Sequence, residues 1–301
     1  MGHNISHVVK SSLESRSNYQ IESLLQSGHR LCKSKDYENA RIHYLKALEI
    51  INQKGSKGLY RDQLCCEIYM TIAYIYQHQL QSDEAELYCR LADTLIGQIK
   101  TQLREDKDLH SVSVLKANKN NHDNHLISSW TDFGRDNLDA LENYTIILAS
   151  LYTKIGSIKY SQYKYESAVS VCQRAIFIKS NLLGIRGDSD IATMYDVIGH
   201  SYKYQGKYTN ALDNYHKSLK IQSKISGNGN YSLSIANCYE NIGEIFHRQK
   251  NFGQALSLHK KSLNIRSKIL GYDTIEVLHS SSRLAKTMWE YNNACESAIQ
   301  D

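Results

Sequence analysis

The chain has 301 residues with a formal net charge of +5, and 22% of its residues are charged while 41% are hydrophobic. This modest charge excludes the strongly basic balance that is typical of nucleic-acid-binding proteins, and no apolar run is long enough to span a membrane. The seven cysteines are scattered without a Cys-x-x-Cys pair, which indicates a reducing compartment, so we predict a cytoplasmic protein.

The first stretch of the chain, residues 1–20, is polar, and we expect a frayed segment or a short leading helix there. Its start, Met-Gly-His-Asn-Ile-Ser, fits the N-myristoylation pattern with Gly2 as the acceptor and Ser6 as the supporting residue. The alternative is a chance match to a short pattern. Because one myristoyl chain anchors only marginally, we expect membrane contact only if Gly2 is modified.

From residue 24 onward a short pattern of large and small residues recurs. Residues three or four apart share one helix face, so each copy predicts a first helix with a small residue, then a turn and a second helix. The small residues let the two helices approach closely, and Gly206 is a turn residue of the kind that ends helices. The copies are Leu24, Gly28, Leu31, Ala40 and Tyr44; Tyr69, Ala73, Tyr76, Ala85 and Cys89; Tyr152, Ile155, Gly156, Ala168 and Cys172; Tyr195, Ile198, Gly199, Tyr202, Ala211 and Tyr215; and Tyr239, Ile242, Gly243, Phe246, Ala255 and His259.

This spacing resembles the helix–turn–helix signature of the tetratricopeptide repeat. The longer period, with stretches such as Lys268-Ile-Leu-Gly271 and Tyr239-Glu-Asn-Ile-Gly243, is similar to the kinesin light chain class of these repeats. The resemblance implies an all-α fold, a right-handed superhelical solenoid of antiparallel helix pairs. The heptad coiled coil of the light chain is absent, so kinesin binding is not implied.

The repeats divide the chain into four parts. After residues 1–20 we expect two repeats in 21–100, a polar insertion or a degenerate repeat in 101–142, and three repeats in 143–301. We favour the insertion, because 101–142 is Asn-rich and shows no pair of small residues twelve apart. The last segment also holds a partial or capping helix pair that begins with Leu284, Ala285 and Met288, either a natural cap or a truncated sixth copy.

The sequence offers no convincing catalytic constellation. There is no nucleophile with its base, no phosphate-binding loop and no pair of working carboxylates. His122 and His125 lack the thiolates that would complete a zinc site, so a solvated pair is the better interpretation. We therefore predict a protein that is not an enzyme, with no catalytic residue, metal, cofactor, nucleic acid or small-molecule substrate.

The candidate site is the concave surface that first helices line in such arrays. Its polar positions outside the core are predicted to be exposed, and cations slightly outnumber acids there, which favours an extended, partly acidic peptide. For each position the alternative is a solvated polar side chain, and the basic residues of the second helices, Arg266 among them, are predicted to form a solvated outer wall. The resemblance implies that Asn241 contacts the ligand backbone. The predicted groove residues are Lys154, Asp196, His200, Lys203, Asn237, Glu240, Asn241, Glu244, His247, Arg248, Arg283 and Lys286.

These observations predict a non-catalytic adaptor that holds a segment of another protein in its groove. The alternative is a structural module that packs within a larger protein or associates with its own copy through the open C-terminal repeat. A monomer that binds an acidic peptide would favour the adaptor, whereas a concentration-dependent mass would favour the structural module.

Overall fold

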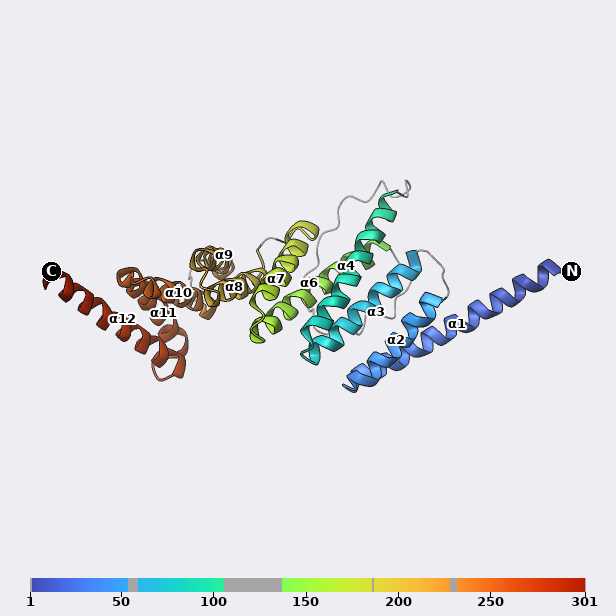
Figure 1. Cartoon of the computed structure of the whole chain (residues 1–301), viewed down its shortest axis with the longest axis horizontal. Helices are drawn as coiled ribbons and strands as arrows, with labels where there is room; N and C mark the ends of the chain where they lie inside the picture. Colours follow the sequence, from blue (N-terminus) through green and yellow to red (C-terminus); the bar gives the residue numbers. More distant parts are fainter. Residues whose placement is uncertain (1, 54–58, 106–136, 186, 228–231, 301) are drawn as a thin grey trace. The chain divides into compact units, whose positions relative to one another are not determined.

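The computed structural model describes residues 2–53, 59–105, 137–185, 187–227 and 232–300, and within these ranges it contains helices and no strand (Figure 1). The predicted all-α fold of paired helices is therefore confirmed. Two compact units divide the chain, Met1–Ile155 and Gly156–Asp301, with the boundary inside one helix.

In the first unit, neighbouring helices in the sequence pack as pairs, α1 with α2 and α3 with α4 (Figure 1). Helix α1 begins at Gly2, so one helix covers the stretch where we expected a frayed segment or a short leading helix. Helix α4 continues to Glu105 and α6 begins at Asn137, so both reach into the predicted 101–142 insertion, whose residues 106–136, with His122 and His125, lie outside the described residues. The helices are α1 (Gly2–Lys33), α2 (Tyr37–Gln53), α3 (Leu59–His78), α4 (Ser82–Glu105) and α6 (Asn137–Ser161).

The second unit begins within α6 and continues the same alternation of first and second helices. Helices α8, α10 and α12 are first helices, and each packs against the second helix that precedes it, while α8 and α10 also pack against the one that follows. Helix α12 runs unbroken past the point where a second helix of a sixth copy would begin, so a single helix replaces the expected pair. The elements are α7 (Tyr165–Phe177) with a π-helical extension (Ile178–Leu182), α8 (Ser189–Tyr204), α9 (Tyr208–Ser226), α10 (Leu233–Arg248), α11 (Phe252–Leu270) and α12 (Ile275–Gln300).

A small residue of each first helix lies at the crossing with its second helix, sixteen positions before the side chain that covers it. An added Cβ at Gly199 would lie 2.7 Å from a ring carbon of Tyr215, and one at Gly243 would lie 2.9 Å from the His259 ring. Gly28 faces Tyr44 and Gly156 faces Cys172 in the same way, and Ala73 and Cys89, both fully buried, stand at the same spacing. This recurring contact sets how closely the two helices of a pair approach.

The turns inside the pairs share one backbone geometry. Lys35, Leu80, Tyr163, Gly206 and Lys250 each have positive φ, between 59° and 73°. The amide of the next residue donates to a carbonyl five residues back, as in the bond from Lys207 N to Tyr202 O at 2.9 Å. This is the Schellman motif, which satisfies the last carbonyls of a helix and reverses the chain. Four of the five positions therefore hold a side chain where glycine is the unstrained residue.

The linker before α8 is fixed by an ion cluster. Lys179, from the π-helical extension, is buried and its Nζ donates to Asp188 Oδ2 at 2.8 Å and to the Asp190 carboxylate. Asp188 is also the N-cap of α8, and its other oxygen accepts from Ile191 N at 2.8 Å. Because one aspartate serves both contacts, the end of one repeat sets the start of the next first helix.

Candidate functional site

The second unit brings most of the predicted groove residues together on its first helices. Asp196, His200 and Lys203 lie on α8, the six predicted residues from Asn237 to Arg248 lie on α10, and Arg283 and Lys286 lie on α12. Lys154 belongs to the first unit, where burial and the charge of Lys154 lower the pKa of His78.

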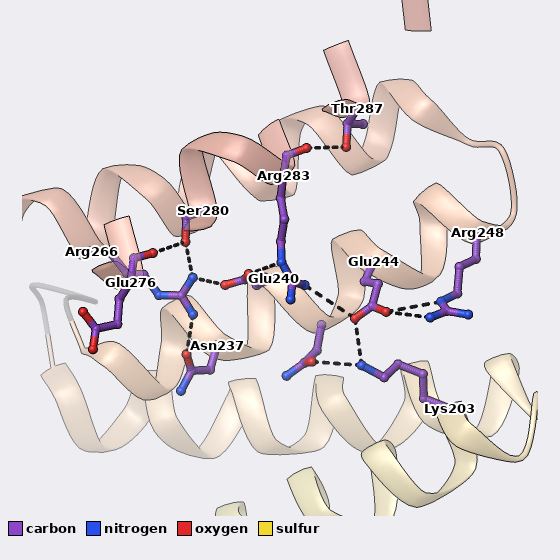
Figure 2. Close-up of polar contacts among 11 residues, drawn as sticks. Lys203, Asn237, Glu240, Glu244, Arg248, Arg266, Glu276, Ser280, Arg283 and Thr287 are labelled. Carbon is purple, nitrogen blue, oxygen red and sulfur yellow. Dashed lines mark hydrogen bonds and ion pairs between the residues drawn. The ribbon is translucent and has the colours of Figure 1, made fainter. Parts of the chain in front are cut away.

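Two carboxylates one turn apart on α10 form the centre of the site, and Figure 2 shows the side chains around them. Arg283 Nε donates to Glu240 Oε1 at 3.0 Å, and Arg266 contacts the other oxygen of Glu240. Lys203 Nζ donates to Glu244 Oε2 at 2.8 Å, and Arg248 Nη2 donates to Glu244 Oε1 at 3.0 Å. We call these six residues, Lys203, Glu240, Glu244, Arg248, Arg266 and Arg283, the α10 ion network.

Burial in this network corrects part of the sequence prediction. Glu240 was predicted to be exposed, but it is only 9% exposed because Arg266 and Arg283 lie over it. Lys203 also lies mostly out of water, with its ammonium between Asn241 and Glu244. These two groups hold neighbouring helices together and are not open to a ligand.

Arg266 is the residue of the network that sequence reasoning placed wrongly. It lies on a second helix, α11, and was predicted to face outward into solvent. Its guanidinium instead reaches the first-helix side, where Nη2 donates to Asn237 Oδ1 at 2.6 Å and Nη1 contacts Glu240 and Ser280 (Figure 2). Burial, together with the nearby charge of Arg283, lowers the pKa of Arg266. The presence of an acid at position 240 inside the stack was the available signal, because a buried carboxylate requires a cation.

The charges of the network do not cancel. Among these six residues four cations surround two carboxylates, an excess of two positive charges, and from outside the network the Glu276 carboxylate acts on Arg266. Burial alone would raise the pKa of Glu244, but the hydrogen bonds and charges of Lys203 and Arg248 outweigh it and lower that pKa to about 2. Glu244 is therefore ionised at neutral pH, and cations contact both oxygens of each carboxylate. The excess lies at the rim, where the side chains of Arg248 and Arg283 are 52% and 51% exposed.

Asp196 and His200, also predicted to line the groove, are half-buried between helices. Burial raises the pKa of Asp196 to about 6, although Ser218 and Cys238 donate hydrogen bonds to its carboxylate. Burial, with the charge of Lys203, lowers the pKa of His200 to about 4. An ordinary environment would place these two pKa values in the opposite order, so burial between the helices dominates both shifts.

An aromatic cluster adjoins the network at the turn ends of the second unit. The rings of Tyr165 and Tyr204 are stacked with centroids 5.4 Å apart, Tyr160 contacts both of them, and Lys203 Nζ lies 5.6 Å from the Tyr204 centroid. These tyrosines were not among the residues predicted from the sequence. Their spacing across the α6–α7 and α8–α9 turns is the feature that would have grouped them.

The remaining predicted residues are placed as follows. Asn237 and Lys286 are exposed, Asn241 is half-buried beside Lys203, and His247 Nε2 lies 2.8 Å from Glu290 Oε2. Gly2 is the first residue of α1, and its modification stays a prediction. Within the described ranges no group of three or more metal-ligating side chains comes together, and no helix there has the length and apolar character needed to cross a bilayer.

Comparison with known proteins agrees with this architecture. The tetratricopeptide repeat family model matches residues 190–268, which span α8, α9, α10 and most of α11. The apo form of RapI is similar in structure, with a TM-score of 0.54 and 15% identity over 97% of this chain and 69% of that chain. This likeness shows the fold alone. A search of curated proteins found no match.

Two further solved structures are similar over much of their length. YrrB, described as a TPR protein with an unusual peptide-binding site, has a TM-score of 0.48 and 15% identity over 91% of this chain and 97% of that chain. A putative kinesin light chain from Podosopora anserina with nearly identical TPR-like repeats has a TM-score of 0.42 and 13% identity over 77% of this chain and 88% of that chain. Residues 190–268 therefore form tetratricopeptide repeats, and the same sixteen-residue contacts and turns recur in the other helix pairs that the structure describes.

Proposed function

We propose that this chain is a non-catalytic adaptor that binds an extended, partly acidic peptide segment of a partner protein along α8, α10 and α12 of the second unit. Tetratricopeptide repeats in general mediate protein–protein interaction, and repeat stacks present extended surfaces for it. The observation that carries the proposal is the uncompensated charge of the α10 ion network, whose two rim arginines are half-exposed.

The network favours an anionic ligand for an electrostatic reason. Four cations contact Glu240 and Glu244, so an incoming carboxylate meets a net positive rim. Arginine presents its donors as a planar fork that pairs with a carboxylate through two hydrogen bonds. Arg248 and Arg283 lie on α10 and α12, which gives an extended segment two contact points on successive first helices.

A test needs to remove the rim cations without breaking the network. Arg248→Gln/Arg283→Gln removes both, while Glu240 keeps Arg266 and Glu244 keeps Lys203. Lys203 itself is a poor target, because its removal would leave Glu244 half-buried with weaker compensation. Lys224→Gln/Lys260→Gln is the matched control, since it removes the same charge from exposed sites on the second helices α9 and α11.

The measurement is binding of the full chain to an array of acidic peptides and their Asn/Gln counterparts, with circular dichroism to confirm helicity. We expect the rim variant to weaken acidic-peptide binding roughly 5- to 30-fold and to flatten its salt dependence, because each exposed ion pair contributes up to about 1 kcal/mol. The control variant should bind like the parent. Equal binding of acidic and neutral peptides, or equal loss in both variants, would overturn the proposal.

A further inference from the structure

Four tyrosines meet where the turns of the α6–α7 and α8–α9 pairs adjoin, and we call Tyr160, Tyr163, Tyr165 and Tyr204 the tyrosine cluster. The rings of Tyr165 and Tyr204 are parallel to within 4°, with centroids 5.4 Å apart. The ring of Tyr163 is perpendicular to that of Tyr165, with centroids 6.3 Å apart. Tyr160 contacts both Tyr165 and Tyr204, and burial, with the charge and hydrogen bond of Tyr204, raises the pKa of Tyr160 to about 12. The cluster therefore links two neighbouring helix pairs.

The cluster is exposed and yet held in place. Tyr163 and Tyr204 are 79% and 59% exposed, so much of their apolar ring surface meets water. Tyr163 lies in the turn after α6, where its amide donates to Tyr160 O at 3.0 Å and the Lys164 amide donates to Lys159 O at 2.9 Å. Rings that are fixed before binding lose little conformational freedom when a ligand arrives. Exposed aromatic side chains that gather in this way mark an interaction site.

Charge beside the cluster decides which class of ligand it accepts. Aromatic ring faces attract cations, but here Lys203 Nζ already lies 5.6 Å from the Tyr204 centroid. The same ammonium belongs to the α10 ion network, in which cations outnumber carboxylates. A second cation at the rings would be repelled. The charge therefore matches a ligand that is neutral at the tyrosine cluster and acidic next to it.

The arrangement of the rings matches proline in the polyproline II conformation. The perpendicular planes of Tyr163 and Tyr165 leave a corner between them for a compact saturated ring. The row from Tyr163 through Tyr165 to Tyr204 has a length comparable to one turn of polyproline II, about 9 Å. Tyrosine hydroxyls donate hydrogen bonds, and a proline residue offers a carbonyl acceptor and no N–H. An aromatic anchor would instead need a deep, dry pocket, and these rings form a shallow surface.

We propose that the tyrosine cluster binds a proline-rich stretch of the partner segment, next to the acidic residues that contact Arg248 and Arg283. This inference rests on the proposed function, because it names the neutral part of the same segment. Lys203 joins the two parts of the surface, since its ammonium lies beside the Tyr204 ring and also donates to Glu244. A polyproline II stretch is extended and largely ordered before it binds, so it reaches along the first helices at a small cost in conformational entropy.

The test is fluorescence anisotropy of the full chain with labelled peptides. One peptide has a block of prolines with a block of aspartates on each side, a second has alanines in place of the prolines, and a third has asparagines in place of the aspartates. We expect the parent to bind the proline–aspartate peptide about 10-fold or more tightly than the alanine–aspartate peptide, through contacts with two aromatic rings.

Two matched variants locate the preference for proline. Tyr163→Ala/Tyr204→Ala removes the two most exposed rings of the cluster and should abolish that preference. Tyr19→Ala/Tyr272→Ala removes two tyrosines outside the cluster, 74% and 76% exposed, and should keep it. Because all four side chains are exposed, the circular dichroism of both variants should match the parent. The comparison of peptides on the parent chain requires no variant at all.

The same peptides separate this inference from the peptide-binding proposal. Arg248→Gln/Arg283→Gln should lose the preference for aspartate over asparagine and keep the preference for proline over alanine. If the parent prefers aspartate but binds the proline and alanine peptides equally, the adaptor proposal stands and this inference is wrong. If the parent prefers proline but not aspartate, the acidic-peptide proposal fails and the proline contact stands. Tighter binding of a phenylalanine–aspartate peptide, or equal loss in both tyrosine variants, would also overturn the inference.

Discussion

The glycine at position 199 leaves room for the ring of Tyr215 at the crossing of α8 and α9. Both residues are buried, and the ring contacts the place where any side chain at 199 would begin. Interiors pack as densely as organic crystals, so the second helix has to shift if a methyl group is added there. The same argument applies to Gly243 and His259 in the next pair.

We expect Gly199→Ala to destabilise the second unit by roughly 1–3 kcal/mol, through overpacking against Tyr215. Gly253→Ala is the matched control, because nothing lies within 4 Å of the added Cβ in the first turn of α11. Since alanine is the better helix former, the control should be neutral or stabilising by up to about 1 kcal/mol. The measurement is the urea unfolding midpoint, and equal destabilisation by both changes would contradict the packing argument.

His259 fills the position that tyrosine occupies at 44 and 215, and it makes stability depend on pH. Burial, with the charges of Arg283 and His247, lowers its pKa from 6.5 to about 4, while Glu244 opposes this shift. The unfolded chain therefore binds a proton at higher pH than the folded chain does. The contribution of His259 to the free energy of unfolding is fully present above pH 6.5. It is lost as the pH drops toward 4, which lowers stability by up to about 3 kcal/mol.

His259→Tyr should make the loss of stability between pH 6.5 and pH 4 shallower, because the titrating ring is removed. A slope remains from His200, whose pKa is also lowered to about 4 by burial. His216→Tyr, at an exposed position on α9, should keep the parent slope. The check is urea unfolding at a series of pH values. Identical slopes for all three proteins would show that His259 is not the group responsible.

At the scale of the helix pair, the turn decides which residues are strained. Lys250 has φ of 60°, and Gly206 has φ of 73° at the equivalent turn position. A side chain in this region crowds the following carbonyl, whereas glycine does not. The exposed turns therefore differ in strain although their hydrogen bonds are alike.

Lys250→Gly is predicted to stabilise the second unit by roughly 0.5–1 kcal/mol, since relief of strain exceeds the added freedom of the unfolded chain. Gly206→Ala, the reverse change at the equivalent turn, should destabilise by about 1 kcal/mol. Thermal unfolding monitored by circular dichroism compares the two. A loss of stability in Lys250→Gly would indicate that the lysine side chain makes a stabilising contact that outweighs the strain.

The helix pairs were predictable from the sequence because their contacts repeat at one spacing. Gly199, Ala211 and Tyr215 were assigned to one crossing, and the structure brings all three into the same contact region. The ion network was not predictable in the same way. Helical periodicity tells which face carries Glu240, but not that the flexible stems of Arg266 and Arg283 reach it from two other helices.

Helix ends were also less predictable than helix pairs. The polar, Ser-rich residues that begin α1 lack a clear apolar stripe, and in the final helix Ser297 and Ala298 resembled the start of a second helix. In the structure α1 and α12 are each continuous. No proline or glycine interrupts α12, so the backbone has no reason to turn where the repeat pattern alone would place a turn.

In the whole molecule, a loss of stability in one repeat affects mainly its neighbours, because each repeat of such an array contacts only the neighbouring repeats. Gly199→Ala should therefore speed amide hydrogen exchange in α8, α9 and the adjoining α7 and α10, and leave α3 and α4 close to the parent. Hydrogen exchange read by mass spectrometry resolves these segments. Uniformly faster exchange over the chain would contradict the local picture and indicate a single cooperative unit.

Three buried cysteines can report on separate contacts between helices. Cys89 and Cys172 lie at the crossings of their own pairs, and Cys238 of α10 contacts Asp196 and Ser218 of the preceding pair. Burial raises the pKa of each thiol, to about 12 for Cys172 and Cys238. Such thiols are almost entirely protonated and out of reach of alkylating reagents until their helices separate. The alkylation rate at each cysteine therefore measures how often the helices around it separate, so local unfolding can be followed in the native chain without an added label.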